Sequence, residues 1–362
     1  MEVGDFHWAD SALADLEQLA AAADDRILGA RALVLRLKHQ LQVDPHVNTD
    51  ALVVAVEGAV ELFDAIGDEL GLAKAWACLS WIPWMRCQAA AAEQALARAV
   101  EHARRAGDRR TEHECLAYLL GTGLFGPLPV AEAVKRCQRL IATPDMPTRA
   151  TAHRTLAVLR AMEGSYEEAR RHLAEDRAIL ADIGFRYLAA AGSVAYAAVE
   201  TFAGDTKAAE HELRQGYATL ERMGETSGLS TAAAHLAEVL FARGELESAL
   251  QLAEIAEKTA SADDLQTLVP ARGARAKALA TRGEIADAEQ VARDAVALAH
   301  ATDWLNLHAD GLVSLAHVLR LAGNLDEAHN ATEEALRLYE RKGNRVSAAR
   351  ARAALTGTLA PA

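Results

Sequence analysis

The amino-acid sequence predicts an all-α fold, a right-handed superhelical solenoid of about eight antiparallel helical hairpins with a repeat of ~40 residues. The first observation behind this prediction is a G-x-x-x-x-A signature that recurs at an almost constant step. Its five regular copies begin at Gly164, Gly204, Gly244, Gly283 and Gly323, which are 40, 40, 39 and 40 residues apart. A sixth copy, GPLPVA, begins at Gly126. A fixed period of this length is typical of stacked helical units rather than of one closed core.

Composition supports the same fold class and excludes several functions. The 362 residues are 51% hydrophobic but only 5% aromatic, and the apolar residues are mainly Ala and Leu, which favour helices. The formal net charge of −13 argues against direct binding of nucleic acid or an anionic membrane, because both need a basic face. The four cysteines show neither C-x-x-C nor zinc-site spacing. The sequence therefore predicts reduced thiols in a cytoplasmic protein, with no metal and no cofactor.

Each repeat is expected to form two antiparallel helices. The signature Gly ends the first helix, where a residue free to adopt positive φ is favoured, and the signature Ala lies on the inner face of the second helix. A second turn closes the unit at 66–69, 106–109, 183–186, 223–226 and 342–345, and Asp-containing turns at 262–264 and 301–303 replace it in two units. Apolar residues at i and i+4, such as Leu236 and Leu240, support the helices, and no sustained period-2 alternation predicts a sheet.

The period also sets the expected boundaries of the array. Two weaker turns, near Cys87 and His46, extend the repeats towards the N-terminus, so the array is predicted to cover residues 26–344. Residues 1–25 are expected to form an N-terminal covering helix, and residues 345–362 a C-terminal capping helix and tail, because terminal covers keep a repeat array soluble. The sequence shows no recognisable signal peptide or membrane span.

The unit resembles the tetratricopeptide repeat. It combines the G-x-x-x-x-A turn with a small residue seven positions before the Gly, at Ala157, Ala197, Ala237, Ala276 and Ala316. The repeat is longer than usual, so the array looks like the long-helix arrays at the C-terminal end of large bacterial signalling proteins. Phrases over most of the chain, such as GDELGLAKAW (67–76) and EALRLYERKGN (334–344), are similar to the helical tail of class III adenylate/guanylate cyclases fused to an AAA-type ATPase. Related tails occur in ATPase-linked transcriptional regulators.

The sequence departs from those proteins in two ways. It contains no G-x-x-x-x-G-K-[ST] phosphate loop and no cyclase catalytic domain. The stretch Asp5-Phe6-His7-Trp8-Ala9-Asp10 resembles a segment that follows the second nucleotide motif in those ATPases, but no nucleotide-binding fold precedes it here. We therefore expect no catalytic role for Asp5. The chain fits either a stand-alone protein or a fragment of a longer regulator.

The resemblance also implies a binding groove. In tetratricopeptide arrays the concave groove is lined by the first helix of each unit, at positions thirteen, ten, six and three before the turn residue. Carried onto this sequence, that spacing gives the candidate groove residues Trp81, Trp84, Arg154, Val158, Thr231, Glu238, Phe241, Lys277, Asp310, His317 and Arg320. They describe a mixed-charge groove with an aromatic end, suited to an extended peptide or a partner helix.

The aromatic end of this set lies beside Pro83, which lacks a backbone N–H and is expected to kink or end its helix. The cluster of Trp81, Pro83 and Trp84 has two interpretations. It forms either a pocket for a small molecule or peptide at the kink, or a bulky plug in an irregular repeat. The sequence favours the plug.

No arrangement in the sequence predicts catalysis. His235 lies one helical turn from Glu238, and His317 one turn from Arg320, but no third group completes a metal site or activates a nucleophile. The sequence therefore predicts a non-catalytic scaffold that binds a peptide or partner protein along its concave groove. The alternative is a ligand-sensing arm of a multidomain signalling protein, either a nucleotide cyclase or an ATPase-linked transcription regulator. A third alternative, an enzyme with its site in the groove, requires a buried polar constellation.

Overall fold

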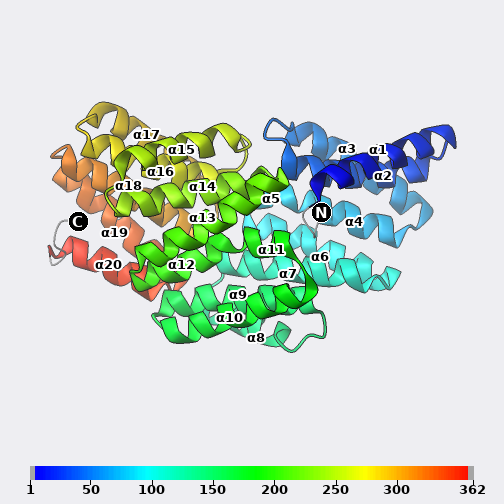
Figure 1. The fold of residues 1–362 in the computed structure, drawn as a ribbon, viewed down its shortest axis with the longest axis horizontal. Helices are drawn as coiled ribbons and strands as arrows, with labels where there is room; N and C mark the ends of the chain where they lie inside the picture. The colour runs from blue at the N-terminus through cyan, green and yellow to red at the C-terminus, as the bar shows by residue number, and fades with distance from the viewer. Residues whose placement is uncertain (1–4, 358–362) are drawn as a thin grey trace.

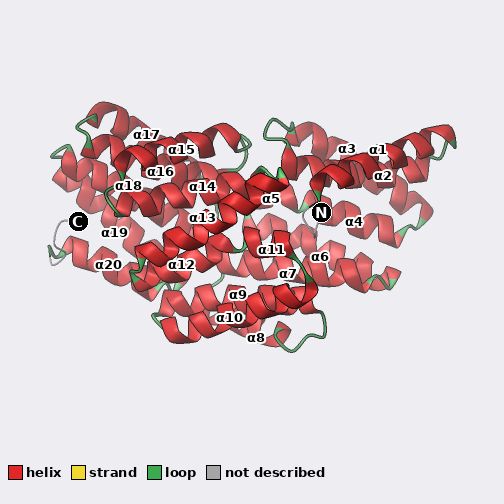
Figure 2. Ribbon diagram, in the orientation of Figure 1, coloured by secondary structure: helices red, strands yellow, loops and turns green. Residues whose placement is uncertain are grey.

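The computed structural model describes residues 5–357, and within this range the chain consists of helices and connecting turns with no β-strand (Figure 2). Eight hairpins follow one another: α2 (Arg26–Val43) with α3 (Thr49–Ile66), α4 (Glu69–Leu79) and α5 (Trp81–Met85) with α6 (Ala89–Ala106), α7 (Arg109–Phe125) with α8 (Val130–Leu140), α9 (Met146–Glu163) with α10 (Tyr166–Ile183), α11 (Arg186–Ala191) and α12 (Ser193–Ala203) with α13 (Thr206–Met223), α14 (Ser227–Ala242) with α15 (Leu246–Thr259), α16 (Leu265–Thr281) with α17 (Ile285–His300), and α18 (Leu305–Leu321) with α19 (Leu325–Lys342). Helix α1 (Phe6–Ala22) precedes them and α20 (Arg345–Leu355) follows them. The predicted all-α class with about eight hairpins is confirmed.

Local signals explain where these helices begin and end. The five regular signature glycines all have positive φ, between 79° and 91°, which is a conformation that a Cβ atom disfavours. Asp205 caps α13, directly after Gly204, and Asp145 caps α9, since their carboxylates accept hydrogen bonds from the backbone N–H groups of Ala208 and Thr148, each over 3.0 Å. The five signature alanines are at most 2% exposed. The predicted close contact between the two helices of each unit is therefore confirmed.

The sixth signature copy uses its glycine differently from the prediction. Gly126 has φ −71°, so it does not end α7 in the left-handed conformation. A Cβ atom on Gly126 would lie 2.4 Å from Cβ of Ala89, at the start of α6, and the glycine therefore permits a close approach of two segments. In contrast, Cys87 has φ 53°, so the weaker turn predicted at this position is present with an unusual residue in it.

Two first helices are interrupted, each for an identifiable reason. Pro83 lacks a backbone N–H and its ring crowds the carbonyl four residues earlier, and the chain is divided at Ser80, three residues before it, into α4 and α5, which agrees with the expected kink. The second break, at Gly192 between α11 and α12, has no proline. A Cβ atom at Gly192 would lie 2.7 Å from Nη1 of Arg154, so the glycine makes room for this side chain. The break thus positions the Arg154 guanidinium inside the fold.

The superhelix is tight enough for its later hairpins to contact its earlier ones, along a line that we call the seam. The contacts are made by the turns before α14, α16 and α18, which reach the end of α2, the start of α3 and the segment between α5 and α6. The hairpins α14–α19 themselves lie to the left of α3 in Figure 1. At the turn before α14, the backbone N–H of Thr226 donates to the carbonyl oxygen of Gln42 over 3.0 Å. At the turn before α16, Nη2 of Arg86 donates to the carboxylate of Asp263 over 3.0 Å.

The seam continues at the turn before α18. The carboxylate of Asp303 accepts hydrogen bonds from the backbone N–H groups of Ala89 and Ala90, over 2.6 and 2.8 Å, and so caps α6 from a hairpin far away in the sequence. The next residue, Trp304, is buried and stacks on Phe125, with ring centroids 4.5 Å apart and an angle of 10° between the planes.

The last contact of the seam is made by a buried ammonium group. Nζ of Lys342, at the end of α19, donates to the carbonyl oxygens of Gly123, Gly126 and Leu128 over 2.9, 2.8 and 2.7 Å. Burial lowers the pKa of Lys342 to about 7. Three carbonyl acceptors nevertheless match the three N–H donors of an ammonium, so this side chain ties α19 to the loop between α7 and α8. Separately, no helix in the described residues 5–357 is both long and apolar enough to span a lipid bilayer.

Candidate functional site

The first helices of the last three hairpins, α14, α16 and α18, pack side by side and bring together most of the candidate groove residues (Figure 1). Their close approach depends partly on Gly273 of α16. A Cβ atom there would lie 2.9 Å from Oγ of Ser314 on α18 and 3.2 Å from Oε1 of Glu238 on α14. We call the surface formed by these helices, with one residue each from α19 and α20, the α14–α18 face. It is defined by Glu238, Phe241, Lys277, Asp310, His317 and Arg320 together with Tyr339 and Arg350.

Lys277 lies at the centre of this face. Its Nζ forms an ion pair with Glu238, one helix away, and lies 5.0 Å from the centre of the Phe241 ring. The edge of His317 on α18 packs against the same ring, with centroids 5.4 Å apart and planes at 88°. Four candidates from three successive hairpins therefore form one continuous set of contacts.

Asp310 is the acid that the last hairpin contributes to this face, from α18. The hydroxyl group of Tyr339, on α19, donates a hydrogen bond to its carboxylate. Asp310 remains exposed to solvent, yet desolvation by the surrounding protein, with a contribution from Glu238, raises the pKa of its carboxyl group to about 6. A side chain that is accessible and still desolvated is expected where the protein surface curves around it.

His317 and Arg320 carry potential donors that the protein itself does not use. Burial, reinforced by the positive charges of Lys277 and Arg320, lowers the pKa of His317 to about 4, so its imidazole is neutral at pH 7. Within residues 5–357, Nε2 of His317 is buried without a hydrogen-bond partner. Arg320 is exposed, has no carboxylate partner in the same range, and partial burial lowers the pKa of its guanidinium.

Arg350, on α20, is a member of this face that the sequence reasoning missed. Its Nη2 donates to the carbonyl oxygens of Thr201 and Phe202, over 3.1 and 2.9 Å, at the C-terminal end of α12. Helix α20 was predicted only as a cover for the last hydrophobic face. No local signal identifies Arg350, because its contacts involve residues about 150 positions earlier in the sequence.

Three of the candidate groove residues are corrected by the structure. The guanidinium of Arg154 donates to both carboxylate oxygens of Asp176, each over 3.1 Å, and Asp176 is fully buried. Val158 belongs to the hydrophobic core and is 4% exposed. Thr231 is 7% exposed and its hydroxyl lies 2.8 Å from that of Thr267. The transferred spacing fails at these positions because side chains of the same or the next hairpin already occupy them, as Asp176 of α10 does at Arg154 and Thr267 of α16 does at Thr231.

The aromatic end of the predicted groove is also filled by the protein. Trp81 packs edge-on against Tyr118, with ring centroids 5.4 Å apart. Trp84 makes edge contacts with Phe125 at 5.8 Å and with Trp304 at 5.3 Å, so it is part of the seam. The plug interpretation of the Trp81, Pro83 and Trp84 cluster therefore describes this region better than a pocket does.

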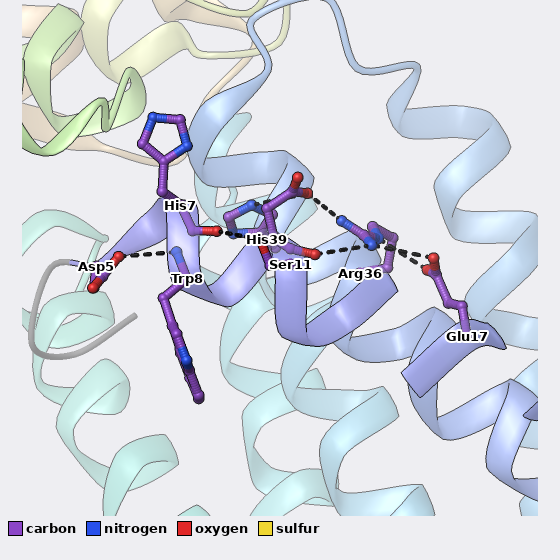
Figure 3. Close-up of polar contacts among 8 residues, drawn as sticks. Asp5, His7, Trp8, Ser11, Glu17, Arg36 and His39 are labelled. Carbon is purple, nitrogen blue, oxygen red and sulfur yellow. Dashed lines mark hydrogen bonds and ion pairs between the residues drawn. The ribbon is translucent and has the colours of Figure 1, made fainter. Parts of the chain in front are cut away.

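The N-terminal stretch 5–10 has structural roles (Figure 3). The carboxylate of Asp5 accepts a hydrogen bond from the backbone N–H of Trp8 over 2.9 Å and so caps α1. Phe6 is buried and packs against Tyr187, with centroids 5.5 Å apart. Asp10 forms an ion pair with Arg36 of α2. These contacts attach α1 to the array, which fits the expectation that Asp5 has no catalytic role.

Other parts of the described chain offer little chemistry. All four cysteines are free and buried, and burial raises the pKa of Cys78, Cys115 and Cys137 to about 12. Residues 5–357 contain no group of three His, Cys, Asp or Glu side chains placed to hold a metal ion. A shallow hollow of about 430 Å³ lies at the turn between α9 and α10, but its cation, Arg170, is already paired with Glu200 over 2.6 Å. The α14–α18 face is therefore the better candidate site.

Comparisons with known proteins identify the fold. No protein-family model matches the chain, and no curated protein matches it. Solved structures that resemble it include a Rap protein complexed with competence and sporulation factor, with a TM-score of 0.57 and 14% identity over 90% of this chain and 96% of the other. The Cut9–Hcn1 hetero-tetramer of APC/C has a TM-score of 0.65 and 12% identity over 91% of this chain and 61% of the other. A Pyrococcus horikoshii signal transduction ATPase with numerous domains, which carries a tetratricopeptide repeat sensor, has a TM-score of 0.50 and 13% identity over 85% of this chain and 52% of the other. The fold is thus a tetratricopeptide-like helical array, whereas the resemblance to cyclase-linked tails in particular remains a prediction.

Proposed function

We propose that this chain is a non-catalytic interaction module that binds an extended peptide or a segment of a partner protein along its concave side, at the α14–α18 face. The observation that carries the proposal is the convergence of unused polar groups on that face. Arg320 is exposed without a carboxylate partner and His317 has an unpaired ring nitrogen, both within the described residues. Buried polar groups in proteins are normally paired, so the unpaired and buried Nε2 of His317, one turn from the exposed Arg320, favours a binding role.

The likeness to the Rap protein supports this proposal at the level of fold. That protein was solved in a complex with competence and sporulation factor, and the present chain covers 96% of its length. The remaining features of the module are part of the proposal. The array covers residues 26–344 between the terminal segments 1–25 and 345–362, and the four free cysteines fit the reducing cytoplasm. The proposed partner is a protein or peptide, and no nucleic acid, membrane or cofactor takes part.

Affinity capture from a lysate of the source cells tests the proposal. The bait is the parent chain, and the test variant is Arg320→Glu, which reverses an exposed charge on the proposed face. Arg341→Glu is the matched control, because Arg341 is exposed on α19 and makes no ion pair among the described residues. Arg154→Glu is unsuitable as a surface variant, since it would place a second carboxylate against the buried Asp176. A partner held by the parent and by Arg341→Glu, but lost by Arg320→Glu, supports the proposal, and equal retention by all three baits contradicts it.

A second candidate function is a sensing arm of a multidomain signalling protein. The observation that favours it is the likeness to the Pyrococcus horikoshii ATPase with a tetratricopeptide repeat sensor, of which this chain covers 52%. The seam offers a way for occupancy of the α14–α18 face to reach the N-terminal half, because the turns before α14, α16 and α18 contact both regions. Sequencing the native reading frame upstream of Met1 tests this function, since it requires a phosphate loop there.

A further inference from the structure

The charge balance of the α14–α18 face is opposite to that of the whole chain. The chain has a formal net charge of −13. The face carries three cations, Lys277, Arg320 and Arg350, against two acids, Glu238 and Asp310. Remote acids are largely screened at physiological salt, where the Debye length is about 8 Å, so an incoming group experiences mainly the local charges.

The three cations differ in how fully the protein uses them. Lys277 is paired with Glu238, and Arg350 donates to the carbonyl oxygens of Thr201 and Phe202. Arg320 has no such partner within residues 5–357, although its guanidinium is partly buried. The excess positive charge of the face is therefore concentrated at Arg320, which presents a planar donor group suited to a carboxylate.

His317 lies on the same side of α18 as Arg320, one helical turn earlier. Its ring makes no hydrogen bond to the described residues, so no polar contact fixes its rotation and a ring nitrogen can turn towards an acceptor. Its ring also contacts the Phe241 ring, at 5.4 Å between centroids. A cation, a neutral imidazole and an aromatic surface thus follow one another over a short distance.

We propose that the α14–α18 face recognises an acidic residue next to an apolar residue in the bound peptide, with the carboxylate held by Arg320 and His317 and the apolar side chain packed on Phe241. This inference rests on the proposed function, since it specifies the peptide that the same face binds. Charge complementarity selects the acid, because a basic side chain at this position would be repelled by the like charge of Arg320.

Selection from a random decapeptide display library on the intact chain tests this specificity. Enrichment of Asp or Glu beside an apolar residue is the expected result. Peptides chosen in this way should bind Arg320→Gln about 10- to 100-fold more weakly than the parent, which corresponds to the loss of one charge-assisted hydrogen-bonded contact. Arg341→Gln is the matched control and should bind them as the parent does.

The imidazole resonances of His317 provide a second readout that a purely structural role would not change. A bound carboxylate stabilises the imidazolium form, so the pKa of His317 should rise from its starting value of about 4 when an acidic peptide is added. The same peptide with Asn or Gln in place of its acid should leave the pKa unchanged. No rise with the acidic peptide would overturn the inference.

The outcomes separate this inference from the function on which it rests. Selected peptides that lose affinity for Phe241→Ala but show neither acidic enrichment nor dependence on Arg320 would contradict the acidic specificity and leave peptide binding at this face intact. If no selected peptide depends on Phe241 or on Arg320, both the inference and the proposed function are wrong. Circular dichroism of each variant establishes that it keeps the helix content of the parent.

Discussion

The ion pair between Arg154 and Asp176 gives the sharpest test of the fold. Asp176 is fully buried, and its carboxylate accepts hydrogen bonds from both Nε and Nη2 of Arg154, each over 3.1 Å. The hydroxyl of Tyr196 donates to the same carboxylate. Nη1 of Arg154 also donates to the carbonyl oxygen of Leu188 over 3.1 Å. This network joins α9, α10 and the broken helix α11–α12.

We expect Arg154→Met to lower the free energy of unfolding by about 3–5 kcal/mol, which is the usual cost of removing one partner from a buried ion pair. The methionine side chain fills part of the space but leaves the Asp176 carboxylate without its cation. Urea unfolding followed by circular dichroism at 222 nm measures the loss. Arg171→Met is the control, because Arg171 is exposed on α10 and should change stability by less than about 0.5 kcal/mol.

A double-mutant cycle decides whether the pair itself is responsible. Asp176→Asn alone should also destabilise the protein, because it leaves a buried guanidinium without a counter-charge. The combination Arg154→Met with Asp176→Asn should cost less than the sum of the single changes, by about 2–3 kcal/mol. Additive effects, or a loss below about 1 kcal/mol for Arg154→Met, would refute the argument that Arg154 is a buried structural residue and would return it to the groove.

Two further predictions concern other buried charges. Lys342→Met should lower the free energy of unfolding in urea by about 2–4 kcal/mol, because three buried carbonyl oxygens lose their donor. The control Lys74→Met, at an exposed position, should be close to neutral. Equal effects of the two changes would contradict the structural role of the seam. Burial raises the pKa of Glu225 to about 8, whereas the pKa of a glutamate in the unfolded chain is about 4.3. Between these two pH values the folded state binds more protons than the unfolded state. The free energy of unfolding should therefore fall as the pH rises from about 4 to 8. At about pH 8.5 the free energy of unfolding of Glu225→Gln should therefore exceed that of the parent by up to about 5 kcal/mol, measured by urea unfolding. At about pH 5 the two free energies should be close. Equal stability of the two proteins at the higher pH would show that Glu225 is not buried as described.

The sequence by itself determined the repeat, the helix ends and much of the contact inside each hairpin. These properties depend on short-range rules, since a glycine such as Gly204 ends a helix through its own φ and an aspartate such as Asp205 caps the next helix within one turn. The small Ala237 and the signature Ala249 also needed only the period to be assigned to a buried face. The four groove candidates Glu238, Phe241, Lys277 and His317 came together because the same period held over the last three hairpins.

Tertiary structure alone decided which charged and aromatic residues remain available to a partner. Val158 and Lys277 both lie six positions before a signature glycine, yet Val158 belongs to the hydrophobic core and Lys277 lies on the α14–α18 face. The seam pairs Lys342 with Gly123, and Asp303 with Ala89, over more than two hundred residues. No local pattern encodes such contacts, because they depend on the small rotation between successive hairpins, which accumulates along the array and determines where the superhelix meets itself.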